Sequence, residues 1–114
     1  MALGSQIEFF DETQEYRNKL NEALPGTMAA ENAFLNEVYK DGKLSRKVKR
    51  LMAMAIALRA GCDRCIVGQT KLAIEAGATR DEVMEALSVA IAMGGTPAMG
   101  WSWRVLKVLE EQGR

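Results

Sequence analysis

The stretch LMAMAIALRAGCDRC, residues 51–65, decides the fold class of this chain. Its first part, Leu51–Leu58, is apolar on all sides, which is typical of a helix that is buried all round or that also packs against another subunit. Gly61 is expected to end that helix. A Cys-x-x-Cys pair, Cys62 and Cys65, follows the glycine directly, so both thiols are expected in or beside the first turn of the next helix.

Composition narrows the chemistry that this pair can carry out. Cys62 and Cys65 are the only cysteines, and the chain contains no histidine. A structural zinc site needs about four nitrogen or sulfur ligands, and hydrolases of the usual kind need a histidine base. We therefore expect no metal site and no cofactor, with a metal shared between subunits as the remaining alternative. Two thiols three residues apart can carry out thiol–disulfide chemistry, because one attacks and the other resolves.

The position of the pair favours a reactive role. Unpaired backbone N–H groups and the positive end of the helix dipole, at the start of a helix, stabilise thiolate over thiol. The spacing also brings the sulfurs close enough to close a small disulfide ring. We therefore interpret Cys62 and Cys65 as the catalytic residues and predict a disulfide between them that dithiothreitol reverses. The alternative is that the two cysteines are small buried hydrophobic residues.

Caps, stops and apolar periodicity predict an all-α subunit of six helices without strands. Pro25-Gly26 is expected to form a turn. Thr79 with Glu82 forms a capping box, which marks the start of the fifth helix. The six helices are expected from Asp11 to Ala23, from a cap at Thr27 to a stop at Asp41-Gly42, from a cap at Ser45 to Gly61, from the cysteine pair to Ala76, from Thr79 to Gly94, and from a cap at Thr96 through Val108.

Length and charge set the broad class of the protein. The 114 residues are expected to form one domain, 1–114, and 15 basic residues balance 15 acidic ones, so no overall charge favours nucleic acid or an anionic membrane. The longest apolar run, Leu51–Leu58, is far shorter than the about 20 residues needed to span a bilayer. Met1–Ser5 has neither the basic nor the apolar region of a signal peptide. We therefore expect a soluble cytoplasmic protein with no nucleic-acid or membrane partner.

Further motifs follow the cysteine pair in a fixed order. The segments 61–66 (GCDRCI), 76–79 (AGAT), 81–83 (DEV) and 92–98 (AMGGTPA) carry them. With these motifs the chain resembles the carboxymuconolactone decarboxylase / alkylhydroperoxidase D family, most closely over 44–101. The resemblance implies a six-helix subunit that assembles into trimers or hexamers. It also implies peroxidase or disulfide-reductase activity, with Cys65 as the residue that attacks and Cys62 as the residue that resolves.

Two positions depart from the pattern of that family. The histidine expected four residues after the second cysteine is Gln69, and the glutamate expected about twelve residues before the first is Arg50. Neither replacement can shuttle a proton at neutral pH, so the usual proton relay, worth about 10²–10⁴-fold, cannot operate. Arg50 could instead stabilise a thiolate while Gln69 donates to the sulfur. Alternatively, Arg50 belongs to a solvated basic run with Arg46, Lys47 and Lys49.

The favoured function is a thiol-dependent antioxidant oxidoreductase that acts on a hydroperoxide or a protein disulfide. A Cys65 thiolate attacks, a sulfenate forms, Cys62 closes the disulfide, and an external dithiol reduces it. A carboxymuconolactone decarboxylase-like enzyme is one alternative, and a non-catalytic oligomeric or redox-sensing protein is another. In each case the apolar surface of Leu51–Leu58 predicts a homo-oligomer.

Overall fold

The computed structural model describes residues 3–114, and these residues contain six helices and no strand, as predicted. Met1 and Ala2, the first residues of the segment in which no signal peptide was expected, lie outside the described residues. None of the described helices is long and apolar enough to cross a bilayer. The helices are α1 (Gln6–Ala23), α2 (Pro25–Tyr39), α3 (Arg46–Ala60), α4 (Asp63–Glu75), α5 (Arg80–Gly94) and α6 (Thr96–Glu111).

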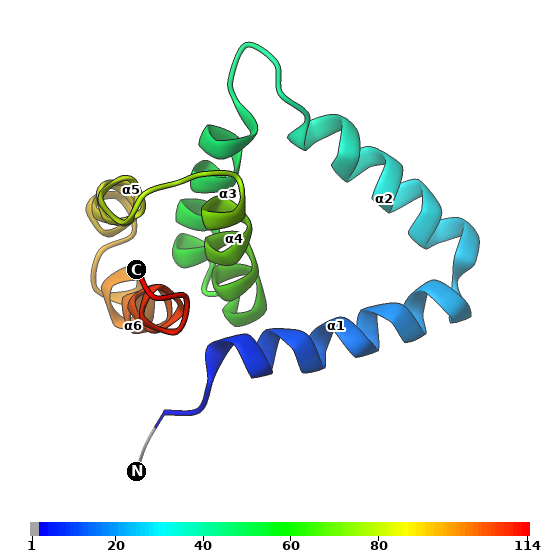
Figure 1. The fold of residues 1–114 in the computed structure, drawn as a ribbon, viewed down its shortest axis with the longest axis horizontal. Coiled ribbons are helices and arrows are strands. Elements are labelled where there is room, and N and C mark those ends of the chain that lie inside the picture. Colours follow the sequence, from blue (N-terminus) through cyan, green and yellow to red (C-terminus); the bar gives the residue numbers. More distant parts are fainter. Residues whose placement is uncertain (1–2) are drawn as a thin grey trace.

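The last four helices form the core, and the first two form an arm that projects from it (Figure 1). α3 packs on α4 and α5, and α6 fills the space against α4 and α5. The side chains between these helices are fully buried, among them Met54, Leu58, Ile66, Val105 and Leu109. Fixing four amphipathic helices around one apolar centre is the usual solution for an all-α domain.

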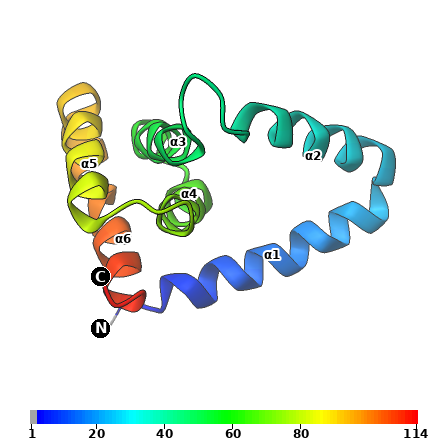
Figure 2. The ribbon, with the colours of Figure 1, turned by 45° about the horizontal axis from the view of Figure 1, so that its top comes forward.

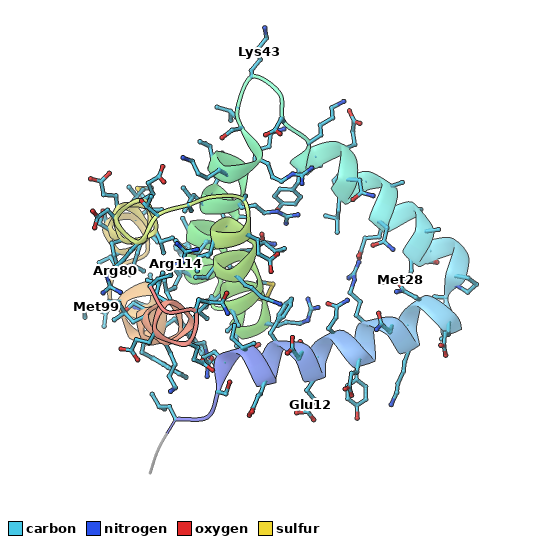
Figure 3. The ribbon with its side chains drawn as sticks, viewed as in Figure 1. Glu12, Met28, Lys43, Arg80, Met99 and Arg114 are labelled. Carbon is cyan, nitrogen blue, oxygen red and sulfur yellow. A yellow bond between two sulfur atoms is a disulfide. The ribbon has the colours of Figure 1, made fainter. Side chains whose placement is uncertain are left out.

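The arm, residues 6–39, meets the core at two places. α1 packs on α4 and α6, whereas α2 contacts α1 and the beginning of α3 (Figure 2). Met28, labelled in Figure 3, is the buried residue of α2 and lies where the two arm helices join. The inner side of the arm therefore faces α3 and α4, and it is here that the candidate site lies.

The basic residues at the start of α3 connect this helix to the end of α2. Lys49 Nζ donates to the carbonyl oxygens of Val38 and Lys40, at 2.8 and 2.7 Å, and Arg46 Nε donates to that of Tyr39 at 3.2 Å. Cations near a helix C-terminus satisfy its last carbonyl groups and its dipole. The beginning of α3 thereby holds the end of α2 in place.

The core helices begin and end where local chemistry predicts. Ser45 Oγ accepts from the N–H of Val48 at 3.2 Å, and Thr79 forms the predicted capping box with Glu82. Gly61 ends α3 with φ at 73°, a left-handed conformation that glycine adopts without strain. These boundaries confirm the predictions for α3 and α5.

Three predicted helix starts were wrong. α1 begins after Ser5, not at Asp11, because Ser5 Oγ caps the N–H of Glu8 at 3.1 Å. In addition, Glu111 of α6 accepts from the N–H of Gln6 at 2.8 Å. This second cap comes from the other end of the chain and reinforces a helix start that Ser5 and Glu8, with the spacing of a capping box, already mark in the sequence.

The starts of α2 and α6 differ from the predicted starts because of proline. Pro25 is the first residue of α2, so the turn predicted at Pro25-Gly26 is helical and Thr27 lies inside the helix. α6 starts at Thr96 after a Gly95 cap, and Thr96 is helical instead of being the cap. In both cases proline sits in the first turn, where its missing N–H has no partner to lose.

Close packing at the end of α5 gives a stability prediction. A Cβ on Gly94 would lie 2.7 Å from Cβ of the fully buried Ala98 and 3.0 Å from Cδ of Arg59. Since Gly94 is the last helical residue, little helix propensity is gained, and Gly94→Ala should destabilise the fold by about 1–2 kcal/mol. Gly100→Ala is the control, because no atom lies within 4 Å of its Cβ. It should stabilise by up to about 1 kcal/mol. Chemical denaturation of both variants tests this, and equal shifts would contradict it.

Candidate functional site

The cysteine pair lies at the start of α4. Cys62 is the N-cap residue, and its sulfur accepts a hydrogen bond from the backbone N–H of Cys65 at 3.3 Å. The two sulfurs form a disulfide, with 5.2 Å between the Cα atoms, which lies in the range of ordinary disulfides. Cys65 is exposed and Cys62 is half-buried. The predicted placement at a helix start is confirmed.

A pocket of about 520 Å³ opens beside the disulfide, between the end of α2 and the two helices α3 and α4. Most of its wall is apolar, and Met52 and Ile56 of α3 keep 49% and 65% of their surface exposed. Its apolar wall consists of Val38, Leu44, Met52, Ala53, Ile56, Ala57 and Ala60, and the remaining lining residues are Tyr39, Lys49, Cys62, Cys65 and Gln69. An apolar cavity with a few polar groups is the usual form of a small-molecule site.

The structure brings Arg50 and Gln69 together. Gln69 lies one helical turn after Cys65 and lines the same pocket. Arg50 Nη1 donates to Gln69 Oε1 at 3.1 Å. Since that oxygen is used by Arg50, the amide NH₂ of Gln69 is the group left to donate toward the pocket. The structure therefore brings together all four residues that the sequence singled out: three line the pocket, and the fourth, Arg50, is bonded to one of them.

The guanidinium of Arg50 lies between Gln69 and an aromatic ring. Its Cζ is 3.5 Å from the centroid of the Tyr39 ring, a cation–π contact. Partial burial lowers the pKa of Arg50 from its ordinary value, and the attraction of Tyr39 offsets part of that effect. Arginine stays protonated under these conditions. Arg50 is thus a fixed positive charge behind Gln69; it does not itself line the pocket.

Tyr39 is a site residue that sequence reasoning missed. In the sequence it is only one of several apolar residues on the helical face predicted after Thr27. The ring reaches the pocket because Lys49 and Arg46 hold the end of α2 on α3. No local signal in the sequence marks a contact of this kind between two helices.

Arg64, the second residue between the cysteines, was also missed. Its Nε donates to Thr13 Oγ1 and its Nη2 to Gln14 Oε1, both at 2.9 Å, and its guanidinium lies 5.1 Å from the centroid of the Phe10 ring. Burial and the neighbouring Arg17 lower the pKa of Arg64. Arg64 therefore fastens the start of α4 to α1 and fixes the orientation of the turn that carries the cysteines.

Residues 3–114 contain no group of three or more histidine, cysteine, aspartate or glutamate side chains that could hold a metal ion. What the fold and the site define is an all-α protein with a Cys-x-x-Cys disulfide at a helix N-terminus, on the wall of an apolar pocket.

Comparison with known proteins agrees with this class. The model of the carboxymuconolactone decarboxylase family matches residues 25–108. The chain belongs to the carboxymuconolactone decarboxylase family. An uncharacterized protein of Cupriavidus necator is 36% identical over 87 residues, which are 76% of this chain and 77% of that protein. Uncharacterized protein 4 in the cox locus of Paracoccus denitrificans is 36% identical over 95 residues, covering 81% and 86%.

Solved structures share the whole architecture. A carboxymuconolactone decarboxylase family protein from Legionella pneumophila superposes with a TM-score of 0.90 at 28% identity, covering 96% of this chain and 97% of that one. A family member from Thermotoga maritima, described with a possible part in the antioxidative response, gives a TM-score of 0.81 at 28% identity. There the coverage is 91% of this chain and 89% of the other. The arm and the core are therefore both similar to experimentally determined folds.

Proposed function

We propose that this protein is a thiol-dependent oxidoreductase that reduces a hydroperoxide or a protein disulfide with Cys62 and Cys65. The observation that carries the proposal is the Cys62–Cys65 disulfide at the N-terminus of α4, on the wall of the apolar pocket. A helix N-terminus favours the thiolate form that such reactions need. The antioxidative description of the Thermotoga maritima relative points in the same direction.

Exposure and hydrogen bonding support different roles for the two sulfurs. Cys65 is the more exposed residue of the pair, so its thiolate is the one that meets a peroxide, and it becomes a sulfenic acid as the O–O bond breaks. Cys62 then attacks that sulfur, forms the disulfide and releases water. In the reductive half, an external dithiol attacks the Cys65 sulfur and Cys62 leaves as thiolate. The N–H of Cys65 stabilises this leaving group.

Thiol counting tests the proposal. The reduced protein should lose two thiols per chain for each equivalent of ethyl hydroperoxide, and dithiothreitol should restore both. The reason is that one peroxide takes two electrons, and the pair supplies them by closing its disulfide. Two thiols that stay unreactive in the native protein would support the non-catalytic alternative instead. Such a cycle requires a reducing environment, and for this reason we propose a cytoplasmic location.

The proposal includes a homo-oligomer, a trimer or a hexamer. Large apolar side chains on the helix surfaces remain exposed in the single chain, namely Phe34 (65%), Ile56 (65%), Val89 (59%) and Met93 (79%). Exposed apolar area of this kind marks interaction sites. Light scattering at micromolar concentration should return a multiple of 12.5 kDa. A mass equal to one chain would contradict the oligomer and leave the thiol chemistry to be judged separately.

A further inference from the structure

We propose that Tyr39 is the acid that protonates the departing oxygen of the substrate, in place of the relay that this chain lacks. This inference rests on the proposed function, because it concerns the step in which a Cys65 thiolate attacks a hydroperoxide. The evidence is the composition of the pocket wall and the contacts that hold Tyr39 there.

The reaction itself creates the need for a proton. When the Cys65 sulfur forms a bond to the terminal oxygen of ROOH, the O–O bond breaks and its electron pair leaves with RO⁻. The sulfur is oxidised by two electrons to the sulfenic acid. An alkoxide is a strong base, so a group that gives it a proton as the bond breaks lowers the barrier. The product is then ROH, and the donor regains its proton from solvent.

Few groups at the pocket can supply that proton. Apart from the cysteines, the titratable side chains among the described lining residues are Tyr39 and Lys49. Lys49 Nζ is engaged by two backbone carbonyl oxygens at the end of α2, at 2.7 and 2.8 Å. Arg50 does not release its proton, and Gln69 does not titrate. The phenol of Tyr39 remains.

The charges around Tyr39 suit this role. From α3, Arg50 lies over its ring, Arg46 donates to its carbonyl oxygen and Lys49 stands beside it on the pocket wall. Lys40, the next residue in the chain, is paired with Glu37 at 2.6 Å and adds no free charge, and α4 presents the neutral Gln69. Negative charge that develops on the phenolic oxygen during proton transfer is therefore placed among cations, which stabilise it. No carboxylate is among the described residues that line the pocket.

Two substrates of almost the same size separate acid catalysis from a structural role. Ethyl hydroperoxide must release an alkoxide, whereas peracetic acid releases acetate, which needs no proton. Tyr39→Phe keeps the ring under Arg50 and removes only the O–H. We expect it to slow oxidation of the reduced protein by ethyl hydroperoxide about 10–100-fold. Oxidation by peracetic acid should slow less than about threefold, and this rate also reports that the site is intact.

The chain offers a matched control, since Tyr16 is its other tyrosine and is 60% exposed on α1. Tyr16→Phe should leave both rates unchanged. Equal slowing with the two oxidants, or no slowing with either, would overturn the role of Tyr39. If the wild-type protein reacts with neither oxidant, the hydroperoxide part of the proposed function fails, and with it the role of Tyr39; this outcome is distinct from the other two.

Discussion

Cys65→Ser is expected to reduce peroxide turnover by roughly 10³-fold or more, which is the usual scale for loss of a nucleophile. A serine hydroxyl has almost the same shape, but it is not ionised at neutral pH and cannot be oxidised to a sulfenic acid. The fold should survive, because Cys65 is exposed and its backbone N–H, not its side chain, makes the hydrogen bond to Cys62. A coupled assay with ethyl hydroperoxide and a dithiol measures the loss.

Cys62→Ser is the matched control for this experiment. It removes the resolving thiol and leaves the attacking one, so a single oxidation should proceed and stop at the sulfenic acid. Dimedone should then label Cys65, as mass spectrometry can show. Labelling of Cys62 in Cys65→Ser together with no labelling in Cys62→Ser would exchange the two roles. Full turnover in either variant would argue against a mechanism that uses both sulfurs.

The core of the fold could be predicted because its signals are local. Ser45, Gly61 and Thr79 act within three or four residues of their own positions, as caps and stops do. The start of the first helix was missed although part of its signal is local, since Ser5 caps the N–H of Glu8 three residues on; Glu111 adds a second cap from the far end of the chain. A contact across 105 residues leaves no periodic trace in the sequence near Gln6.

The same distinction applies to the site. Cys62 and Cys65 could be placed at a helix start from the sequence, and the family pattern paired position 50 with position 69. The structure confirms that the two side chains meet. Tyr39 and Arg64 were missed, because their roles depend on how the arm packs on α3 and α4. Docking of one helix on another is a tertiary event that short-range patterns do not encode.

The hydrogen bond between Arg50 and Gln69 also limits how the site can activate a thiol. With no histidine in the chain and a permanent cation at position 50, we expect stabilisation of the thiolate to depend on fixed positive charge and not on a base that titrates. The guanidinium contacts the pocket wall through Gln69, which accepts its hydrogen bond and lines the pocket. Arg50→Glu should therefore raise the pKa of the reactive thiol, because a carboxylate nearby disfavours the charged form. Ultraviolet absorbance of the thiolate against pH measures this pKa.

A matched control separates this effect from a general change of charge. Arg80→Glu makes the same change at the start of α5, at an exposed residue that donates to the Arg114 carbonyl and does not line the pocket. Its effect on the pKa of the thiol should be smaller. If Arg50→Glu changes neither that pKa nor the activity, the cation does not act on the site.

The double change Arg50→Glu with Gln69→His should raise peroxide turnover by about 10²-fold or more, the lower end of what general acid–base catalysis supplies. The 3.1 Å contact between the present side chains shows that positions 50 and 69 are within reach of each other. An introduced carboxylate can then orient an introduced imidazole, one turn after Cys65, so that it takes the proton of the thiol. Steady-state rates of the wild type, both single variants and the double variant form a complete cycle. A relay requires a gain well above the product of the two single effects; a gain equal to that product would mean that the two side chains act independently.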